Sequence, residues 1–302
     1  MLDQAAKEVT VIGTTASGMT TKGMQSKFLY PGDTDARTGR LRYLVGGRGS
    51  PVVLLHTVRT QAEHFHRLIP LLLPKFTVYA LDFPGMGYSD IVTGASYNEP
   101  NMRQGVERLL TELDLTDVVL IGESMGAVVA MTTARAEPHR VRRVVAVNPY
   151  DYQGGILRSS LFARVIISGV LAPMIGPTFA KVEPKPAMRA ILRGGLGDKS
   201  ALTDEYLDEL LTVGRQAGYS KVARAVYGNL PSLIAARSSY SSVSAPVDFV
   251  YGEKDWSRQS DRDGNSALLP AANVTVVEGA GHFLVLERPD VVAALIKATP
   301  EG

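Results

Sequence analysis

The pattern of apolar and polar positions changes character along the chain. Two short runs in which apolar and polar residues alternate come first, at 26–33 and 39–47, and the turn residues between them predict an antiparallel pair of strands. Uniformly apolar runs then alternate with helical segments, which is typical of a parallel sheet covered on both faces. These runs lie at 51–56, 76–82, 117–124, 141–149, 246–255 and 274–282. The pattern therefore predicts the α/β class, with a doubly wound, mostly parallel eight-stranded sheet.

Helical periodicity fills the segments between these strands and changes most clearly after residue 150. The expected core helices lie at 62–75, 101–115, 125–138, 260–269 and 289–298. Between 150 and 239 the strand pattern disappears, and amphipathic helical runs replace it, including 202–217 with Thr203 as its N-cap. Such a block between two strands predicts an inserted helical lid over the strand ends, where open α/β sheets bind ligands. We expect a lead-in at 1–27, extended or poorly ordered, an α/β core at 28–149 and 240–302, and a helical cap or lid at 150–239.

Composition narrows the classes of function. The chain has 302 residues, of which 45% are hydrophobic, and a formal charge of +2, so no strong field favours nucleic acid or an anionic membrane. It contains no cysteine, which excludes disulfides, thiolate metal sites and a cysteine nucleophile. The first residues lack the pattern of a signal peptide, and no apolar run approaches the length of a membrane span. We expect a cytoplasmic protein that binds a small molecule, without nucleic acid, membrane span, metal or cofactor; the oligomeric state stays open.

The sharpest local signal is the pentapeptide GESMG at 122–126, which contains Ser124. It follows an apolar strand and precedes a helix, as the nucleophile elbow of a serine hydrolase requires. Glycine is needed two residues before and after the serine because side chains there would collide across a strained turn. The competing interpretation is an ordinary helix N-cap serine.

A serine nucleophile requires a base that a third group orients. Of the five histidines, only His282 follows the final predicted strand, in a GAGHF turn at the carboxyl edge of the sheet. We expect surface or lid-facing positions for His64 and His66, and a capping or surface position for His139.

The orienting acid should lie between serine and histidine in the chain, at the end of a strand. Asp255 meets this condition in the run VDFVYGEKDW, and Asp151, after the preceding strand, is the competing candidate. We favour Asp255 because its turn faces the same edge as His282. Asp261 and Asp263 are expected to interact with a helix N-terminus.

Taken together, these motifs resemble the lid-bearing α/β-hydrolase superfamily over residues 28–298. Besides the elbow, the chain shows DFPGMGYS at 82–89, similar to the DxPGxGxS loop of that family, and a GxGH ending at His282. The resemblance implies Ser124 as nucleophile, Asp255 as acid and His282 as base. No HExxH or clustered histidine and carboxylate spacing appears, so we expect no metal site. Epoxide and haloalkane hydrolases of this fold carry an aspartate where this chain has Ser124.

One segment departs from the family pattern. Members commonly have His-Gly after the first parallel strand, whereas this chain has HTVR at 56–59. We expect the backbone N–H groups of Val58 and Met125 to form the oxyanion hole, with Thr57 as the near alternative to Val58. The Thr57 hydroxyl is a further donor to oxyanion or substrate. Arg59 either anchors a substrate carboxylate or forms a structural ion pair.

The lid is rich in apolar residues, which predicts a substrate with a hydrophobic portion. They are Leu157, Leu161, Phe162, Val165, Ile166, Ile167, Leu171, Met174, Ile175 and Phe179. We expect hydrolysis of a carboxylic ester or related acyl compound through an acyl-enzyme. The alternatives are a hydrolase of carbon–carbon bonds in a β-diketone or ring-cleavage product, and a receptor-like ligand-binding protein that retains the triad.

Overall fold

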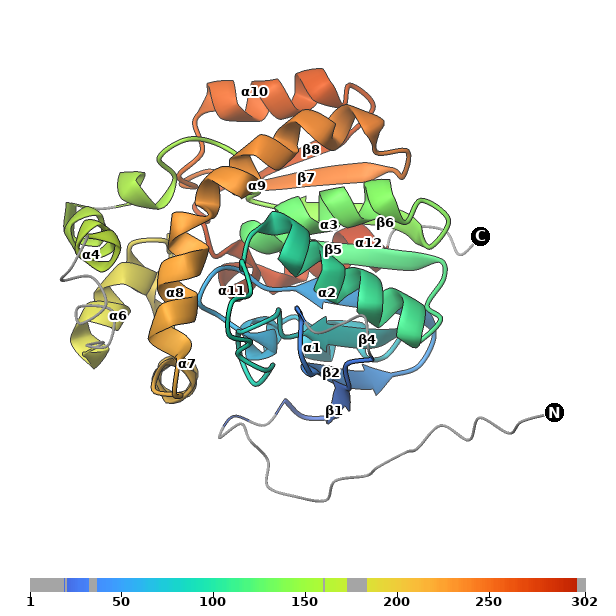
Figure 1. Ribbon diagram of the computed structural model, residues 1–302. Helices are drawn as coiled ribbons and strands as arrows, with labels where there is room; N and C mark the ends of the chain where they lie inside the picture. Colours follow the sequence, from blue (N-terminus) through green and yellow to red (C-terminus); the bar gives the residue numbers. More distant parts are fainter. Residues whose placement is uncertain (1–18, 20, 33–36, 160, 173–183, 298–302) are drawn as a thin grey trace.

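A single mixed sheet forms the centre of the molecule (Figure 1). The computed structural model describes residues 19, 21–32, 37–159, 161–172 and 184–297. The strands are β1 (Gln25–Leu29), β2 (Leu41–Gly47), β3 (Ser50–Leu55), β4 (Phe76–Leu81), β5 (Val118–Glu123), β6 (Val141–Val147), β7 (Val247–Gly252) and β8 (Asn273–Val277). In the described ranges they pair in the order β1-β2-β4-β3-β5-β6-β7-β8, antiparallel at β1–β2 and β2–β4 and parallel elsewhere. The predicted eight-stranded, mostly parallel sheet is confirmed.

Alternate residues of the central strands enter two separate cores. In β3, Val53 and Leu55 pack into the core beneath α2 and α3, while Val52 and Leu54 pack into the core beneath α1 and α12. Because successive side chains of a strand point to opposite faces, a strand covered on both faces must be apolar throughout. This is the physical origin of the uniform apolar runs.

The core helices agree with the predicted segments except at 62–75 and at 284–287, where a short helix was not predicted. They are η1, a 3-10 turn (Ala62–Phe65), α1 (Ile69–Leu72), α2 (Glu99–Glu112), α3 (Met125–Ala136), α10 (Gln259–Leu268), α11 (Leu284–Glu287) and α12 (Pro289–Lys297). One helix was expected over 62–75, but two short helical turns occupy it. Pro70 has no N–H to donate and would clash with the carbonyl four residues earlier, so α1 starts with Pro70 in its first turn.

Helices fill the segment between β6 and β7. They are η2 (Ile156–Arg158), α4 (Leu161–Leu171), α6 (Lys185–Arg193), η3 (Lys199–Ala201), α7 (Asp204–Gly214), α8 (Tyr219–Gly228), α9 (Leu230–Ala236) and η4 (Arg237–Ser242). The Thr203 side chain accepts a hydrogen bond from Tyr206 N at 3.2 Å, so the predicted N-cap is confirmed. In Figure 1, α4, α6, α7 and α8 gather at one end of the sheet. The lid boundaries at 150 and 239 stay a prediction.

The last residues of the segment expected as an N-terminal lead-in belong to a strand. Most of 1–27 lies outside the described residues, but strand β1 begins at Gln25 and pairs with β2, so the end of this segment belongs to the sheet. Of the apolar residues expected in the lid, Met174, Ile175 and Phe179 also lie outside the described part. Within that part, no helix has the length and apolar character needed to cross a bilayer.

Candidate active site

Ser124 lies in the tight turn between β5 and α3. Its φ of 59° and ψ of −113° are unusual for a residue with a side chain, and such strain persists only where the surroundings fix it. Ser124 N donates to Val147 O at 2.8 Å, and Ser124 O accepts from Ala127 N at 3.1 Å. The turn therefore holds the hydroxyl at the carboxyl edge of the central strands.

The glycines on either side of the turn are sterically required. A Cβ on Gly122 would lie 2.1 Å from the carbonyl oxygen of Gly126. A Cβ on Gly126 would lie 2.0 Å from the carbonyl oxygen of Leu55, at the end of β3. The first collision is the one that the pentapeptide predicts, whereas the second depends on β3 lying beside β5.

Three residues from distant parts of the chain form one line of hydrogen bonds. His282 Nε2 lies 2.9 Å from Ser124 Oγ, and His282 Nδ1 lies 2.5 Å from Asp255 Oδ1. Ser124 follows β5, Asp255 follows β7, and His282 follows β8. The structure thus brings together the three residues that the sequence singles out for nucleophilic catalysis, in the order that a triad requires.

The Asp255 carboxylate is held in its ionised form. Burial pushes its pKa upward, but the charge of His282 and hydrogen bonds from His282 and Ser257 outweigh burial and leave the pKa below its ordinary value. Ser257 N donates to Oδ2 at 2.9 Å, so each carboxylate oxygen has its own donor. An ionised acceptor at Nδ1 fixes the ring proton there and leaves Nε2 to accept the serine proton.

Asp151, the competing acid, is engaged elsewhere. It is 1% exposed, and its Oδ2 accepts from Asn265 Nδ2 at 2.9 Å. Burial raises the pKa of Asp151 to about 7. Asp261 lies in the first turn of α10 and accepts from the backbone N–H of Arg258 at 2.8 Å. This agrees with the expected interaction of Asp261 with a helix N-terminus.

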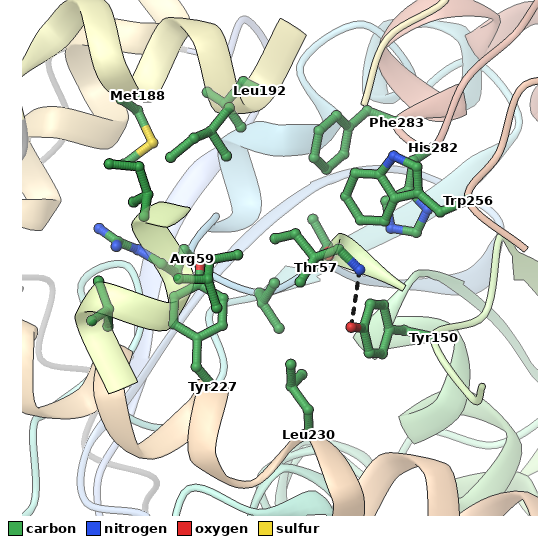
Figure 2. Close-up of a pocket in the computed structure, with 16 residues that line it drawn as sticks. Thr57, Arg59, Tyr150, Met188, Leu192, Tyr227, Leu230, Trp256, His282 and Phe283 are labelled. Atoms are coloured by element: carbon green, nitrogen blue, oxygen red, sulfur yellow. Dashed lines mark hydrogen bonds between the residues drawn. The ribbon is translucent and has the colours of Figure 1, made fainter. Parts of the chain in front are cut away.

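Trp256 packs face to face on His282, a contact that the sequence interpretation missed. The ring centroids are 3.7 Å apart and the planes differ by 13°. Figure 2 shows the two rings side by side at one wall of the pocket. The stack restricts the imidazole to one plane, and the backbone N–H of His282 adds a 2.6 Å hydrogen bond to Gly195 O. The signal that the sequence offered for this contact is an aromatic residue directly after the candidate acid.

The loop after β3 has a fixed backbone. Phe83 N donates to His56 Nε2 at 3.1 Å, so His56 Nδ1 carries the ring proton and donates to Thr57 O at 2.8 Å; burial lowers the His56 pKa to about 3 and keeps the ring neutral. Thr60 Oγ1 also donates to Thr57 O, at 3.0 Å. The peptide is planar and trans, so Val58 N–H points away from both of these donors.

Two side chains of this loop border the pocket. Thr57 is fully buried, and within the described part of the chain its hydroxyl has no hydrogen-bond partner. Arg59 adopts a positive φ of 58°, and its guanidinium lies 5.8 Å from the ring centroid of Tyr219. It also hydrogen-bonds the hydroxyls of Tyr219 and Tyr227, both on α8, and so connects the loop to the helices between β6 and β7.

An apolar pocket opens beside His282. Its walls are Thr57, Val58, Arg59, Tyr150, Ile156, Ile166, Ile167, Val170, Met188, Ile191, Leu192, Tyr227, Leu230, Trp256, His282 and Phe283. Figure 2 places Arg59, Tyr227 and Met188 across the pocket from His282. Helix α4 turns Ile166 and Ile167 toward the pocket, but an exposed group faces outward, namely Leu161, Phe162, Val165 and Leu171. The apolar residues of this segment thus divide between two faces.

Of the two positions expected for His64, surface or lid-facing, the structure shows the second, because His64 is buried and faces α7 in the segment 150–239. His64 is 1% exposed, with Nε2 paired to the Glu123 carboxylate and Nδ1 2.7 Å from Tyr206 Oη. A buried carboxylate needs a donor, and only the fold shows that His64 supplies it. His66 is partly buried, with its ring 5.4 Å from the ring of Tyr206 in α7, and burial lowers its pKa to about 4. His139 is exposed, as expected.

Comparison with known proteins gives consistent matches. A model described as the alpha/beta hydrolase family matches residues 52–295. The chain is 23% identical over 277 residues to haloalkane dehalogenase 2 of Mycobacterium tuberculosis, covering 89% of this chain and 95% of that protein. It is 27% identical over 254 residues to the 2-hydroxy-6-oxononadienedioate/2-hydroxy-6-oxononatrienedioate hydrolase of Cupriavidus pinatubonensis, covering 80% and 84%. The crystal structure of Cfl2 from Burkholderia cenocepacia superimposes with a TM-score of 0.77 at 21% identity, covering 91% and 95%.

Proposed function

The chain belongs to the alpha/beta hydrolase family, and we propose that it is a serine hydrolase that cleaves a carboxylic ester or related acyl compound through an acyl-enzyme on Ser124. The line of hydrogen bonds from Ser124 Oγ through His282 to Asp255, at 2.9 and 2.5 Å, carries this proposal. Halide or epoxide chemistry through an aspartyl ester is not proposed, because a serine occupies the elbow.

In the proposed reaction, Ser124 Oγ attacks the substrate carbonyl carbon while its proton passes to His282 Nε2. The carbonyl π pair becomes the charge of a tetrahedral oxyanion. When that intermediate collapses, the bond to the leaving alcohol breaks and His282 returns the proton to the alcohol oxygen. Water then repeats the sequence on the acyl-enzyme, with His282 as base, and releases the acid. Asp255 holds the ring tautomer and stabilises the imidazolium throughout.

We assign the oxyanion hole to the backbone N–H groups of Val58 and Met125. Met125 is the first residue of α3, so its N–H belongs to the free amides of a helix N-terminus. The fixed Thr57 carbonyl supports the Val58 assignment, since it directs the Val58 N–H to the opposite side of the peptide. The Thr57 hydroxyl, buried at the pocket wall, is the additional donor in this scheme.

The pocket supports a substrate with an apolar portion. Ile167, Val170 and Leu192 line it from helices between β6 and β7, so we propose that residues 150–239 form the lid that shapes the substrate site. Arg59 lies across the pocket from His282 (Figure 2) and is the proposed contact for a polar or anionic group at the far end of the substrate.

Carbon–carbon bond hydrolysis is the second candidate. The observation in its favour is the 27% identity to the Cupriavidus pinatubonensis hydrolase over 80% of this chain. Ester cleavage stays the first candidate. A substrate with one ester group and an apolar portion fits the triad and the apolar wall, without an enol or a second carbonyl group in the substrate. Turnover of p-nitrophenyl esters measured beside a dienone substrate separates the two, and fast dienone cleavage with negligible ester turnover would reverse their order.

The decisive test of the serine mechanism is labelling by a fluorophosphonate, which reacts with activated serine. We expect stoichiometric labelling of the folded protein at Ser124, identified by peptide mass spectrometry, and no labelling of Ser124→Ala. Ser124→Ala should lose about 10⁴-fold or more in kcat. Retention of full esterase activity by that variant would refute the proposal.

A further inference from the structure

The carboxylate next to the nucleophile in the sequence is buried and bound on both oxygens. Glu123 lies between Gly122 and Ser124, and its side chain is inaccessible to solvent. Oε1 accepts from Val285 N at 2.8 Å, and Oε2 is paired with His64 Nε2. Val285 is three residues beyond His282, so Glu123 connects the elbow directly to the segment that carries the base.

His64 extends this connection to helix α7. Its Nδ1 lies 2.7 Å from the hydroxyl of Tyr206, in the first turn of α7. Burial raises the pKa of Tyr206 well above its ordinary value, so the hydroxyl stays protonated and has a proton to donate to Nδ1. The donor and acceptor roles are then consistent along this series of hydrogen bonds, which we call the hydrogen-bond chain. Tyr206 donates to His64 Nδ1, His64 Nε2–H donates to Glu123, and Val285 N–H donates to the other carboxylate oxygen.

Packing supports the same connection. The His64 ring lies 6.1 Å from the ring of Phe283, the residue after His282, at an interplanar angle of 74°. It lies 6.0 Å from the ring of Tyr206. The His64 ring therefore lies close to both the base-bearing segment and α7. Buried polar groups in such an arrangement are costly to leave unpaired, so a change at one link shifts the others.

We propose that Tyr206, His64 and Glu123 are positioning residues, which couple the docking of α7 to the alignment of Ser124 with His282. The inference rests on the proposed serine mechanism. None of the three contacts the reacting atoms, and each acts through the next: Tyr206 orients His64, His64 orients Glu123, and Glu123 holds the elbow against the segment of Val285.

A second anchor of α7 provides the matched control. Glu209, one turn further along α7, accepts from Gln61 Nε2 at 2.9 Å and from Tyr88 Oη at 2.6 Å. It ties the same helix to the core, and within the described part of the chain its hydrogen bonds go to Met19, Gln61 and Tyr88 and not to the elbow. Glu209→Gln therefore weakens the attachment of α7 while leaving the hydrogen-bond chain from Tyr206 to Glu123 complete.

The experiment measures the rate at which a fluorophosphonate phosphonylates Ser124, over a range of reagent concentrations. We expect Tyr206→Phe and Glu123→Gln each to lower the maximal rate about 10-fold, with the half-saturating concentration unchanged, because alignment rather than binding is lost. The maximal rate of the double variant Tyr206→Phe/Glu123→Gln should lie within about twofold of that of the slower single variant, because both substitutions break the same hydrogen-bond chain. His64→Gln keeps a donor and an acceptor and should stay within about threefold of wild type.

Each other outcome overturns the inference. Additive losses in the double variant would show that Tyr206 and Glu123 act independently. A loss of maximal rate in Glu209→Gln equal to that in Tyr206→Phe would show that the attachment of α7, and not the hydrogen-bond chain, sets the rate. Wild-type rates in Tyr206→Phe or Glu123→Gln, with Ser124 still labelled, would remove this inference alone. Absence of labelling in the wild type would remove the proposed function and this inference with it. If Glu123→Gln does not fold, Tyr206→Phe and His64→Gln decide the question.

Discussion

Replacing Asp255 by asparagine tests which of two buried carboxylates orients the base. Asp255 Oδ1 lies 2.5 Å from His282 Nδ1, and Oδ2 accepts from Ser257 N at 2.9 Å. An amide has one acceptor oxygen and therefore satisfies only one of these two donors. With the amide oxygen toward Ser257, the NH₂ group faces Nδ1 and selects the tautomer with its proton on Nε2, which cannot accept the serine proton.

The geometry sets the size of the effect. A wrong tautomer lowers kcat by about 10⁴-fold in serine proteases with this arrangement, which corresponds to about 5 kcal/mol in activation free energy. The opposite amide orientation restores the tautomer but places two donors face to face at Ser257, at a cost of about 1–3 kcal/mol. Because 1–3 kcal/mol corresponds to a factor of about 5 to 160, the population of this second orientation sets the smallest loss. We therefore expect Asp255→Asn to lose between about 10-fold and 10⁴-fold in ester turnover.

Stability provides a second readout of the same substitution. The pKa of Asp255 in the fold lies below its unfolded value, so the ionised carboxylate stabilises the fold above the ordinary value of 3.8 and loses this contribution as the pH falls through the folded-state pKa. The melting temperature of Asp255→Asn should therefore be lower than that of wild type at pH 7. The two should converge as the pH falls below 3.8.

Asp151→Asn is the matched control, with the opposite pH dependence. Its folded-state pKa of about 7 lies above the ordinary value of 3.8, so its contribution is present below pH 3.8 and lost as the pH rises toward 7, by about 4 kcal/mol in all. Asp151→Asn should keep ester turnover within about threefold. Its melting temperature relative to wild type should be higher at pH 8 than at pH 5. If Asp151→Asn loses activity and Asp255→Asn retains it, the assignment of the acid is wrong.

Three further substitutions test the local geometry. Gly126→Ala places a Cβ 2.0 Å from Leu55 O and should lower the free energy of unfolding by about 3 kcal/mol or more, measured by urea denaturation. Trp256→Ala removes the ring stacked on His282 and should lower kcat for ester cleavage about 10-fold or more, whereas Trp256→Phe should stay near wild type; equal rates would show that the stack has no positioning role. If the Thr57 hydroxyl contacts the oxyanion, Thr57→Val should lower kcat about 10-fold with KM little changed. Thr57→Ser keeps the hydroxyl and should leave kcat near the wild-type value.

Several features of the fold and the candidate site were predictable because they depend on short stretches of chain. The uniform apolar strands, the GESMG turn and the Thr203 N-cap each follow from rules that act over fewer than about ten residues. Ser124, Asp255 and His282 were each recognisable as residues at a strand end. Parallel strands bring their carboxyl ends to one edge, which is why local positions sufficed to select these three.

Other features were not predictable because they depend on which segments become neighbours. The order of the strands places β3 beside β5, and that neighbour makes Gly126 indispensable through Leu55 O. The burial of His64 depends on Glu123 from one element and Tyr206 from another, 59 and 142 residues away in sequence. No periodicity in the chain encodes these separations.

The sequence by itself determined the α/β class, the elbow and the set of residues from which a triad is chosen, because backbone sterics and alternation act locally. Only the tertiary structure decided that His282 faces Asp255 and not Asp151, that Trp256 covers the imidazole, and which side of α4 borders the pocket. These outcomes depend on packing and on the pairing of buried polar groups across the sheet, which are properties of the assembled fold.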